Sequence, residues 1–145
     1  PCNVLTLSRK RGLEEECSRF GLKPPIIFPG DFSIQSGREA ARSLLCTDPR
    51  PSAVFCSSDT AAIGMITGLR ESGLSVPQDV SVIGFDDIEM AAFYYPALTT
   101  IRQERRLLGR RAAELLVARL GGNKAKGEVI PVTLVERGTT GPAPT

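Results

Sequence analysis

The feature that most constrains this sequence is a regular alternation of short apolar segments with amphipathic ones between residues 26 and 85. The apolar segments predict strands and the amphipathic ones helices, in the order strand 26–28, helix 36–46, strand 53–56, helix 59–72 and strand 81–85. Alternation at this spacing favours a parallel sheet with crossover helices. The near-continuous apolar strands are typical of a sheet covered on both faces. We therefore expect an α/β fold, a parallel sheet with flanking helices.

The two ends of the chain add further elements to this pattern. Residues 11–20 predict a helix, and residues 98–103 an extended segment after a short helical or irregular stretch. Residues 105–120 predict a strong helix, in which an apolar stripe built largely from leucines ends before Gly121. Residues 128–140 predict a last strand, and Pro131 places it at a sheet edge because proline cannot donate a ladder hydrogen bond.

Composition narrows the class of protein. The chain has 145 residues, of which 41% are hydrophobic, so it can bury one packed core. A formal net charge of +2 is too small to indicate nucleic-acid binding. No apolar run approaches the roughly 20 residues that cross a bilayer. Four scattered cysteines without CxxC spacing are typical of reduced thiols, so we expect a cytoplasmic location.

Catalytic motifs are missing from the sequence. Histidine, the commonest general base and metal ligand, is absent, and so are a GxSxG motif and a Walker loop. A carboxylate pair such as Asp59 and Asp86 could in principle serve glycoside hydrolysis. We expect no enzyme, no cofactor and no metal site.

Acidic residues follow two of the predicted strands. Asp86 and Asp87 come directly after strand 81–85, and Asp59 comes shortly after strand 53–56. Ligands of open α/β sheets bind beyond the carboxyl ends of the strands. These acids therefore predict a ligand cleft at that edge of the sheet.

Several motifs occur together and in register. They are GDFSIQSGREAARSLL at 30–45, GFDD at 84–87, LTTIRQ at 98–103 and VIPVTLVERGTT at 129–140. With them, the chain resembles the effector-binding core of bacterial transcription regulators of the lactose-repressor/galactose-repressor family, over roughly residues 9–140. The resemblance implies a periplasmic-binding-protein-like fold of type I, in which two α/β subdomains enclose a small-molecule cleft.

The resemblance also implies an incomplete core, mostly its C-terminal subdomain. Residues 1–103 would form that subdomain without its first strand–helix–strand, and 104–123 a crossover helix that packs on the missing N-terminal subdomain. Residues 124–140 would return as a closing strand, followed by a tail at 141–145. The leucine stripe would then be exposed, which favours self-association.

Site residues are implied by the same resemblance. The expected ligand-binding set is Arg9, Phe32, Ser58, Asp59, Asp86 and Arg105, with Asn3 and Leu5 bordering the cleft. Asp86 would accept hydrogen bonds from ligand hydroxyls, Arg9 would bind bidentately, and Phe32 would stack on the ligand. Arg105 would suit an anionic effector. Plain structural roles compete with these: Asp59 as a helix cap, Asp87 as a backbone cap and Arg105 on a solvated helix face.

The resemblance implies a dimer surface and a function. Ile63, Met65, Phe93 and Tyr94 lie on segments that resemble the dimer surface of the family, although core packing explains them as well. We expect an effector-sensing and dimerisation module of a transcriptional regulator, with a sugar, sugar phosphate or sugar acid as effector. A homodimer would bind operator DNA only through a helix-turn-helix outside this chain, and no membrane is involved. The alternative is a periplasmic sugar-binding transport receptor.

Overall fold

The computed structural model describes residues 4–124 and 126–144, apart from the side chains of residues 4 and 5. The elements in chain order are α1 (Val4–Arg19), α2 (Ile34–Leu45), β1 (Ala53–Phe55), α3 (Asp59–Glu71), β2 (Ser81–Asp86), α4 (Glu89–Phe93), β3 (Thr99–Gln103), α5 (Arg105–Leu120) and β4 (Val132–Val135). None of these helices is long and apolar enough to cross a membrane.

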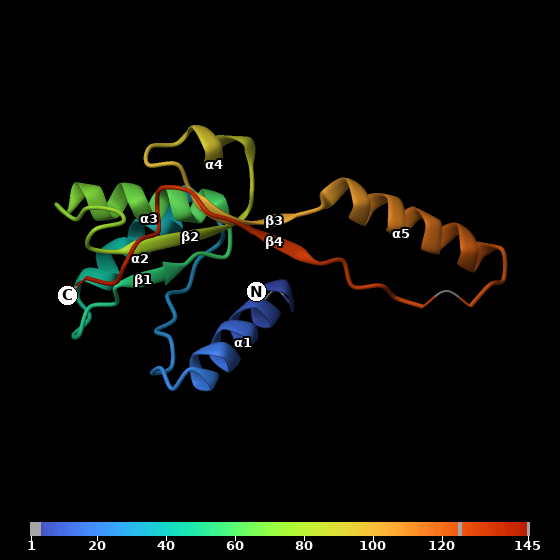
Figure 1. Ribbon diagram of the computed structural model, residues 1–145, viewed down its shortest axis with the longest axis horizontal. Helices are drawn as coiled ribbons and strands as arrows, with labels where there is room; N and C mark the ends of the chain where they lie inside the picture. Colours follow the sequence, from blue (N-terminus) through green and yellow to red (C-terminus); the bar gives the residue numbers. More distant parts are fainter. Residues whose placement is uncertain (1–3, 125, 145) are drawn as a thin grey trace.

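One sheet with the strand order β1-β2-β3-β4 organises the fold (Figure 1). β1 runs parallel to β2 and β2 parallel to β3, so their carboxyl ends meet at one edge. β4 pairs antiparallel with β3 and is the edge strand that Pro131 predicted. The expected α/β class with helices flanking the sheet is confirmed, and the antiparallel β4 makes the sheet mixed.

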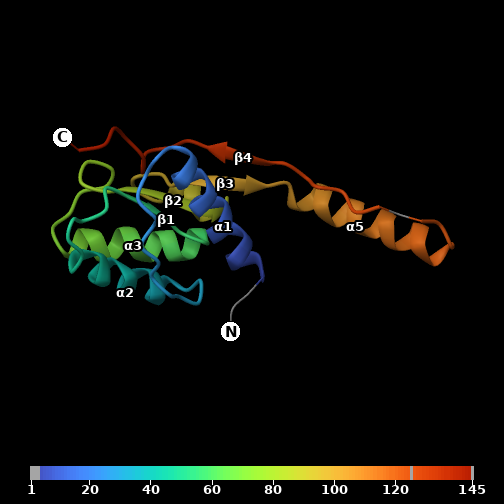
Figure 2. The ribbon, with the colours of Figure 1, turned by 90° about the horizontal axis from the view of Figure 1, so that it is seen from below.

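Helices α2 and α3 lie together against one face of the sheet (Figure 2). Their backbones touch because glycines face the partner helix. A Cβ on Gly37 would collide with the carbonyl oxygen of Ala61, and one on Gly64 with that of Ile34. The core lies between these helices and the sheet and includes Leu44, Met65, Ile66, Leu69, Val80, Val82 and Leu98.

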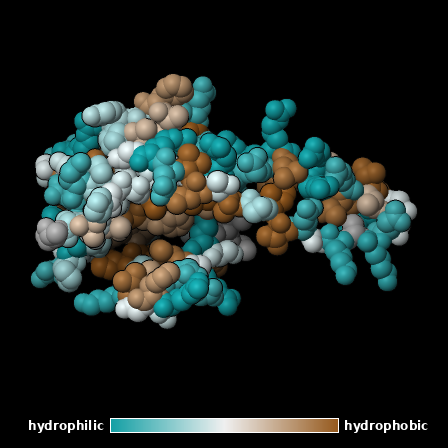
Figure 3. All heavy atoms as spheres, in the orientation of Figure 1, coloured by the Kyte–Doolittle hydropathy of each residue, from teal (hydrophilic) through white to brown (hydrophobic). Residues whose placement is uncertain are grey.

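Helix α5 projects away from the rest of the fold, joined to it through β3 and β4 (Figure 1). None of its residues is buried. Leu116 is 60% exposed and Leu120 is 79% exposed. Apolar side chains are accordingly visible along this arm (Figure 3). The exposed leucine stripe expected from the sequence is present.

The predicted strand at 26–28 was wrong, because these residues have no regular secondary structure. Ile26 and Ile27 are about half exposed, at 53% and 49%. An extended segment needs a neighbouring strand to accept and donate its backbone hydrogen bonds, and no described strand pairs with this one. Two smaller differences concern bounds: α1 begins seven residues before position 11, at Val4, and β4 spans only Val132–Val135.

Candidate functional site

The carboxyl ends of β1 and β2 position the candidate site. Helix α3 begins soon after β1, and Ser58 is its N-cap, since the Ser58 hydroxyl accepts a hydrogen bond from the backbone N–H of Ala61 at 3.1 Å. The same hydroxyl donates to the carbonyl oxygen of Phe32 at 3.1 Å. Ser58 is therefore nearly buried, and its hydroxyl joins the start of α3 to the segment before α2.

Asp59 was expected either to bind the ligand or to cap a helix, and the structure gives it another role. It is not the helix cap, because Ser58 fills that role, and its side chain is fully buried rather than facing a cleft. One carboxylate oxygen accepts the Thr100 hydroxyl, and the other accepts the backbone N–H of Ile88 at 2.8 Å. Burial raises the pKa of Asp59, while these two hydrogen bonds oppose the rise. Asp59 thus fastens α3 to β3 and to the loop after β2.

Gly84 of the GFDD motif makes room for that carboxylate. A Cβ at position 84 would collide with Oδ1 of Asp59 and lie 3.0 Å from Cδ2 of Leu98. Both neighbours are fully buried. The glycine therefore serves close packing against Asp59, which a sequence alone does not reveal.

Asp86 ends β2 in an unusual backbone conformation, with φ of 116°. Its Oδ1 accepts a hydrogen bond from Nε2 of Gln103 at 2.6 Å. Within the described residues its other oxygen, Oδ2, accepts no hydrogen bond. The side chain is only partly buried, so this oxygen is available to a ligand donor.

Asp87 is committed to the protein itself, by ion pairs rather than by the backbone cap expected. It accepts Nε of Arg102 at 2.6 Å and Nη2 of Arg137 at 2.7 Å, with only 10% of its side chain exposed. Burial alone would raise the pKa of Asp87, but the hydrogen bonds and charges of the two arginines lower it. Arg137 and Gln103 were not predicted as site residues, although both lie within motifs that carry the resemblance, Gln103 in LTTIRQ and Arg137 in VIPVTLVERGTT.

The structure places Arg9 within α1, whereas the sequence predicted it just before a helix that begins at residue 11. Its Nη1 donates to the carbonyl oxygen of Ser57 at 2.6 Å, and its guanidinium stands 3.6 Å above the ring centre of Phe85. Partial burial lowers the pKa of Arg9, and the charge of Asp86 opposes this. Arg9 therefore places a cation near the Asp86 anion, at the carboxyl ends of β1 and β2.

The other two expected ligand residues are less tightly placed. Phe32 has a positive φ of 68°, and its carbonyl oxygen accepts the hydroxyls of Ser58 and Thr60. Its ring is half-buried. Arg105 is exposed, and its Nη2 donates to the carbonyl oxygen of Asp87 at 3.4 Å, which brings it to the loop that carries Asp86. Asn3 and the side chain of Leu5 lie outside the described residues.

The expected dimer residues divide into two groups. Met65 is 2% exposed and Ile63 is 9% exposed. Both are buried, so the structure does not place these two residues on a surface. Phe93 is 78% exposed. Tyr94 is partly exposed and its hydroxyl shares a hydrogen bond with that of Thr67 at 3.0 Å. An aromatic surface therefore remains around α4.

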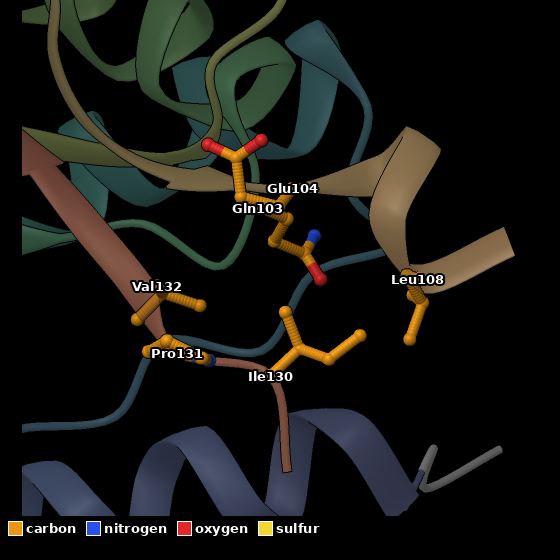
Figure 4. Close-up of a pocket in the computed structure, with 6 residues that line it drawn as sticks. All are labelled: Gln103, Glu104, Leu108, Ile130, Pro131 and Val132. Carbon is orange, nitrogen blue, oxygen red and sulfur yellow. The ribbon is translucent and has the colours of Figure 1, made fainter. Parts of the chain in front are cut away.

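A pocket lies where α5 leaves the sheet (Figure 4). Its walls are Gln103, Glu104, Leu108, Ile130, Pro131 and Val132. The side chains of Gln103, the last residue of β3, and Glu104, the N-cap of α5, leave the chain in opposite directions (Figure 4). The Gln103 amide thus stands between the Asp86 carboxylate and the root of α5.

Comparison with known proteins places this geometry in a family. The model of the periplasmic binding protein-like domain matches residues 3–140. The HTH-type transcriptional repressor PurR of Pectobacterium atrosepticum is 42% identical over 120 residues, which are 81% of this chain and 35% of that protein. The PurR of Actinobacillus pleuropneumoniae is 46% identical over 100 residues, 69% of this chain and 30% of that protein. The chain belongs to the LacI family. It covers a C-terminal part of the effector-binding core of these transcriptional regulators, as the resemblance implied.

Solved structures agree with this assignment. A dimeric lac repressor with a C-terminal deletion superposes with a TM-score of 0.88 at 36% identity, covering 95% of this chain and 51% of that one. A LacI-family regulator from Enterococcus faecium with bound ribose superposes with a TM-score of 0.83 at 33% identity, covering 94% of this chain and 51% of that one. The chain thus spans about a third of the curated relatives and about half of the solved chains. Since these relatives are transcriptional repressors, they support a regulator over the alternative of a periplasmic transport receptor.

Proposed function

We propose that this chain supplies the C-terminal wall of an effector cleft in a cytoplasmic transcriptional regulator and binds a sugar or sugar derivative there. The observation that carries the proposal is the Asp86 carboxylate. One of its oxygens is held by Gln103 and the other is open, at the edge where three parallel strands end. A carboxylate with an open oxygen is suited to accept hydroxyl donors of a sugar.

Arg9 and Arg105 complete the proposed site. Arg9 is fixed by Ser57 and Phe85 and presents a guanidinium next to the charge of Asp86. Its planar fork can donate to ring hydroxyls that Asp86 does not reach. Arg105 adds a second, exposed cation, which favours a sugar phosphate or a sugar acid. A relative from Enterococcus faecium was solved with ribose bound, which supports a sugar for this chain.

Sensing requires two states that the effector distinguishes. We propose that the effector binds more tightly when the two subdomains close on it, and that this differential affinity shifts the pose of DNA-binding heads outside this chain. Residues 1–103 and 124–140 would belong to the C-terminal subdomain and residues 104–123 to the crossover. Phe93 and Tyr94 would contribute to a homodimer surface. No catalytic turnover of the effector is expected.

The experiment is a thermal-shift screen of the full-length polypeptide that carries this segment. The panel is D-ribose, D-glucose, D-ribose 5-phosphate and D-gluconate. A ligand at a hundred times its Kd stabilises the native state by about 2.7 kcal/mol, which raises the Tm by several degrees. We expect at least one hit, which Asp86→Ala abolishes.

The matched control is Glu89→Ala, which removes an exposed carboxylate three residues further along the chain. This variant should retain the hit in full. A panel without any hit, or a hit that Asp86→Ala leaves unchanged, would contradict the proposed function. A hit restricted to the phosphate or the acid would indicate that the cations Arg9 and Arg105 contact the effector.

A further inference from the structure

We propose that Asp87 couples the effector turn, residues 86–88, to the arm, residues 104–131, and so links effector binding to the position of the arm. The arm holds α5 and the segment that returns to β4. This inference rests on the proposed function, in which Asp86 binds the effector and the arm includes the crossover between subdomains. Asp87 itself does not touch the effector and acts through its neighbours on both sides.

Three arginines converge on Asp87. Its Oδ2 accepts Nε of Arg102 at 2.6 Å, and its Oδ1 accepts Nη2 of Arg137 at 2.7 Å. Its carbonyl oxygen accepts Nη2 of Arg105 at 3.4 Å. Arg102 lies in β3, Arg105 is the first residue of α5, and Arg137 follows β4 closely. Asp87 therefore contacts the chain both where it enters the arm and where it has left it.

The arm is attached to the sheet at its root. β3 and β4 pair antiparallel up to Gln103 and Val132, so the chain enters and leaves the arm side by side (Figure 1). No residue of α5 is buried. Within the arm, Nε of Arg111 lies 3.4 Å from a carboxylate oxygen of Glu128 on the returning segment. This ion pair joins α5 to that segment, so a change in the direction of the arm acts first on the residues at its root.

The effector turn on the other side of Asp87 has a backbone that must be held. Asp86 and Asp87 have φ of 116° and 49°, which residues other than glycine rarely adopt. Such conformations persist only where the surroundings impose them. Asp59 holds the end of the turn by accepting the N–H of Ile88 at 2.8 Å, and the arginines hold Asp87. Moving the arginines would therefore move the turn, and the Asp86 carboxylate with it.

Arg137 provides the stronger of the two ion pairs. Its side chain is 17% exposed and that of Asp87 is 10% exposed, whereas that of Arg102 is 47% exposed. Ion pairs shielded from water interact more strongly than exposed ones. Arg137 is also fixed to the start of β3, since its Nη1 donates to the carbonyl oxygen of Leu98 at 2.8 Å and its backbone N–H to Oγ1 of Thr99 at 2.9 Å. It thus ties the segment after β4 to β3 and to Asp87.

The first test needs no ligand and asks whether the two arginines act through one carboxylate. It measures the Tm of the full-length polypeptide that carries this segment. Asp87→Asn removes the charge that both arginines bind, so Arg137→Gln or Arg102→Gln should cost less Tm in that background than in wild type. Glu71→Gln is the matched control, because it breaks an ion pair of 2.6 Å with Arg38 between α3 and α2. Its Tm loss should add to that of Arg137→Gln. Losses that add in full for both arginines with Asp87→Asn would overturn the inference.

The second test measures hydrogen exchange in the arm, and its probe is the sugar of the panel that raises the wild-type Tm most. Each variant is saturated with this sugar, as judged by its own Tm titration. In wild type the sugar should change the exchange rates of α5 backbone amides at least about fivefold, the lower end of usual allosteric coupling. In Asp87→Asn the sugar should still raise the Tm but change these rates less than about twofold. Glu71→Gln should respond as wild type does.

The response of α5 to the sugar separates coupling from a merely structural role, because a structural loss lowers the Tm without removing that response. Arg137→Gln should weaken the response more than Arg102→Gln does, and should add nothing in the Asp87→Asn background. Should Asp87→Asn not fold, a full response in Arg137→Gln would overturn the inference.

Three other results would overturn the inference alone. They are a wild type that binds the sugar without any response of α5, a full response in Asp87→Asn, and a folded Asp87→Asn that no longer binds the sugar. Failure of wild type to bind any sugar of the panel would overturn the proposed function, and this inference with it.

Discussion

Gly84→Ala tests whether Asp59 is the buried anchor of the site. The added Cβ would collide with Oδ1 of Asp59 and stand 3.0 Å from Cδ2 of Leu98. Asp59 cannot move away freely, because it is fully buried and both its oxygens accept hydrogen bonds. The substitution must therefore displace the carboxylate or the strand.

The magnitude follows from these two effects. Overfilling a packed core costs about 1–3 kcal/mol. Weakening a hydrogen bond to a charged group costs up to about 1.5–3 kcal/mol. We expect Gly84→Ala to lower the free energy of unfolding by about 3 kcal/mol. Gly109→Ala is the matched control, since a Cβ there meets nothing within 4 Å, and it should stabilise α5 by about 0.5–1 kcal/mol.

The assay is urea unfolding followed by circular dichroism, with a double-mutant cycle. In Asp59→Ala the carboxylate is gone, so the methyl group of Gly84→Ala has room. The double variant should therefore lose at least about 1 kcal/mol less than the sum of the two single losses. Strict additivity, or a Gly84→Ala variant as stable as wild type, would refute the close packing of Gly84 against Asp59.

Three further outcomes are expected. Arg137→Ala should lower the free energy of unfolding by about 1–3 kcal/mol at pH 7, because Asp87 loses an ion pair whose side chains are 17% and 10% exposed. The ion pairs lower the pKa of Asp87 in the folded protein, so their stabilisation is fully present above the unfolded pKa of about 3.9 and is lost as the pH falls through the lower pKa of the folded state. Acid titration of wild type and Arg137→Ala should therefore show that the difference between their unfolding free energies shrinks over this pH range. Burial raises the pKa of the Cys56 thiol to about 12, so iodoacetamide at pH 8 should modify exposed Cys46 and leave Cys56 unmodified in the native protein. Equal labelling of the two cysteines in peptide mass mapping would contradict this. Leu116→Glu on the exposed leucine stripe of α5 should change the unfolding free energy by less than about 0.5 kcal/mol. It should nevertheless reduce self-association of the isolated chain, measured by sedimentation. Unchanged self-association would show that the stripe is not the surface through which copies of the chain associate.

Elements with strong local signals were predictable from the sequence. Helix α3 follows a capping serine and a clear apolar pattern, and the sequence predicted it at 59–72 against Asp59–Glu71 observed. Helix α5 was predicted at 105–120 and spans those residues. Strand 26–28 failed because a strand depends on a partner, which local composition does not report. Ile26 and Ile27 are apolar enough for a strand but have no neighbour to pair with among the described residues.

Side-chain partners were the harder part of the site. The sequence predicted that acids gather at the carboxyl ends of the strands, and Asp59, Asp86 and Asp87 do lie there. It did not predict that Asp59 is buried, because that depends on Thr100 and on the missing Cβ of Gly84, both distant in the chain. Roles that arise from contacts across 15 to 50 residues leave no local pattern.

The central claim is that the effector binds at Asp86, and a crystal structure with the tightest-binding sugar of the panel tests it most directly. The account predicts a ligand hydroxyl within about 2.5–3.0 Å of Oδ2 of Asp86, with the Arg9 guanidinium as a second partner. A sugar bound elsewhere, with Asp86 still contacting only Gln103, would contradict the account.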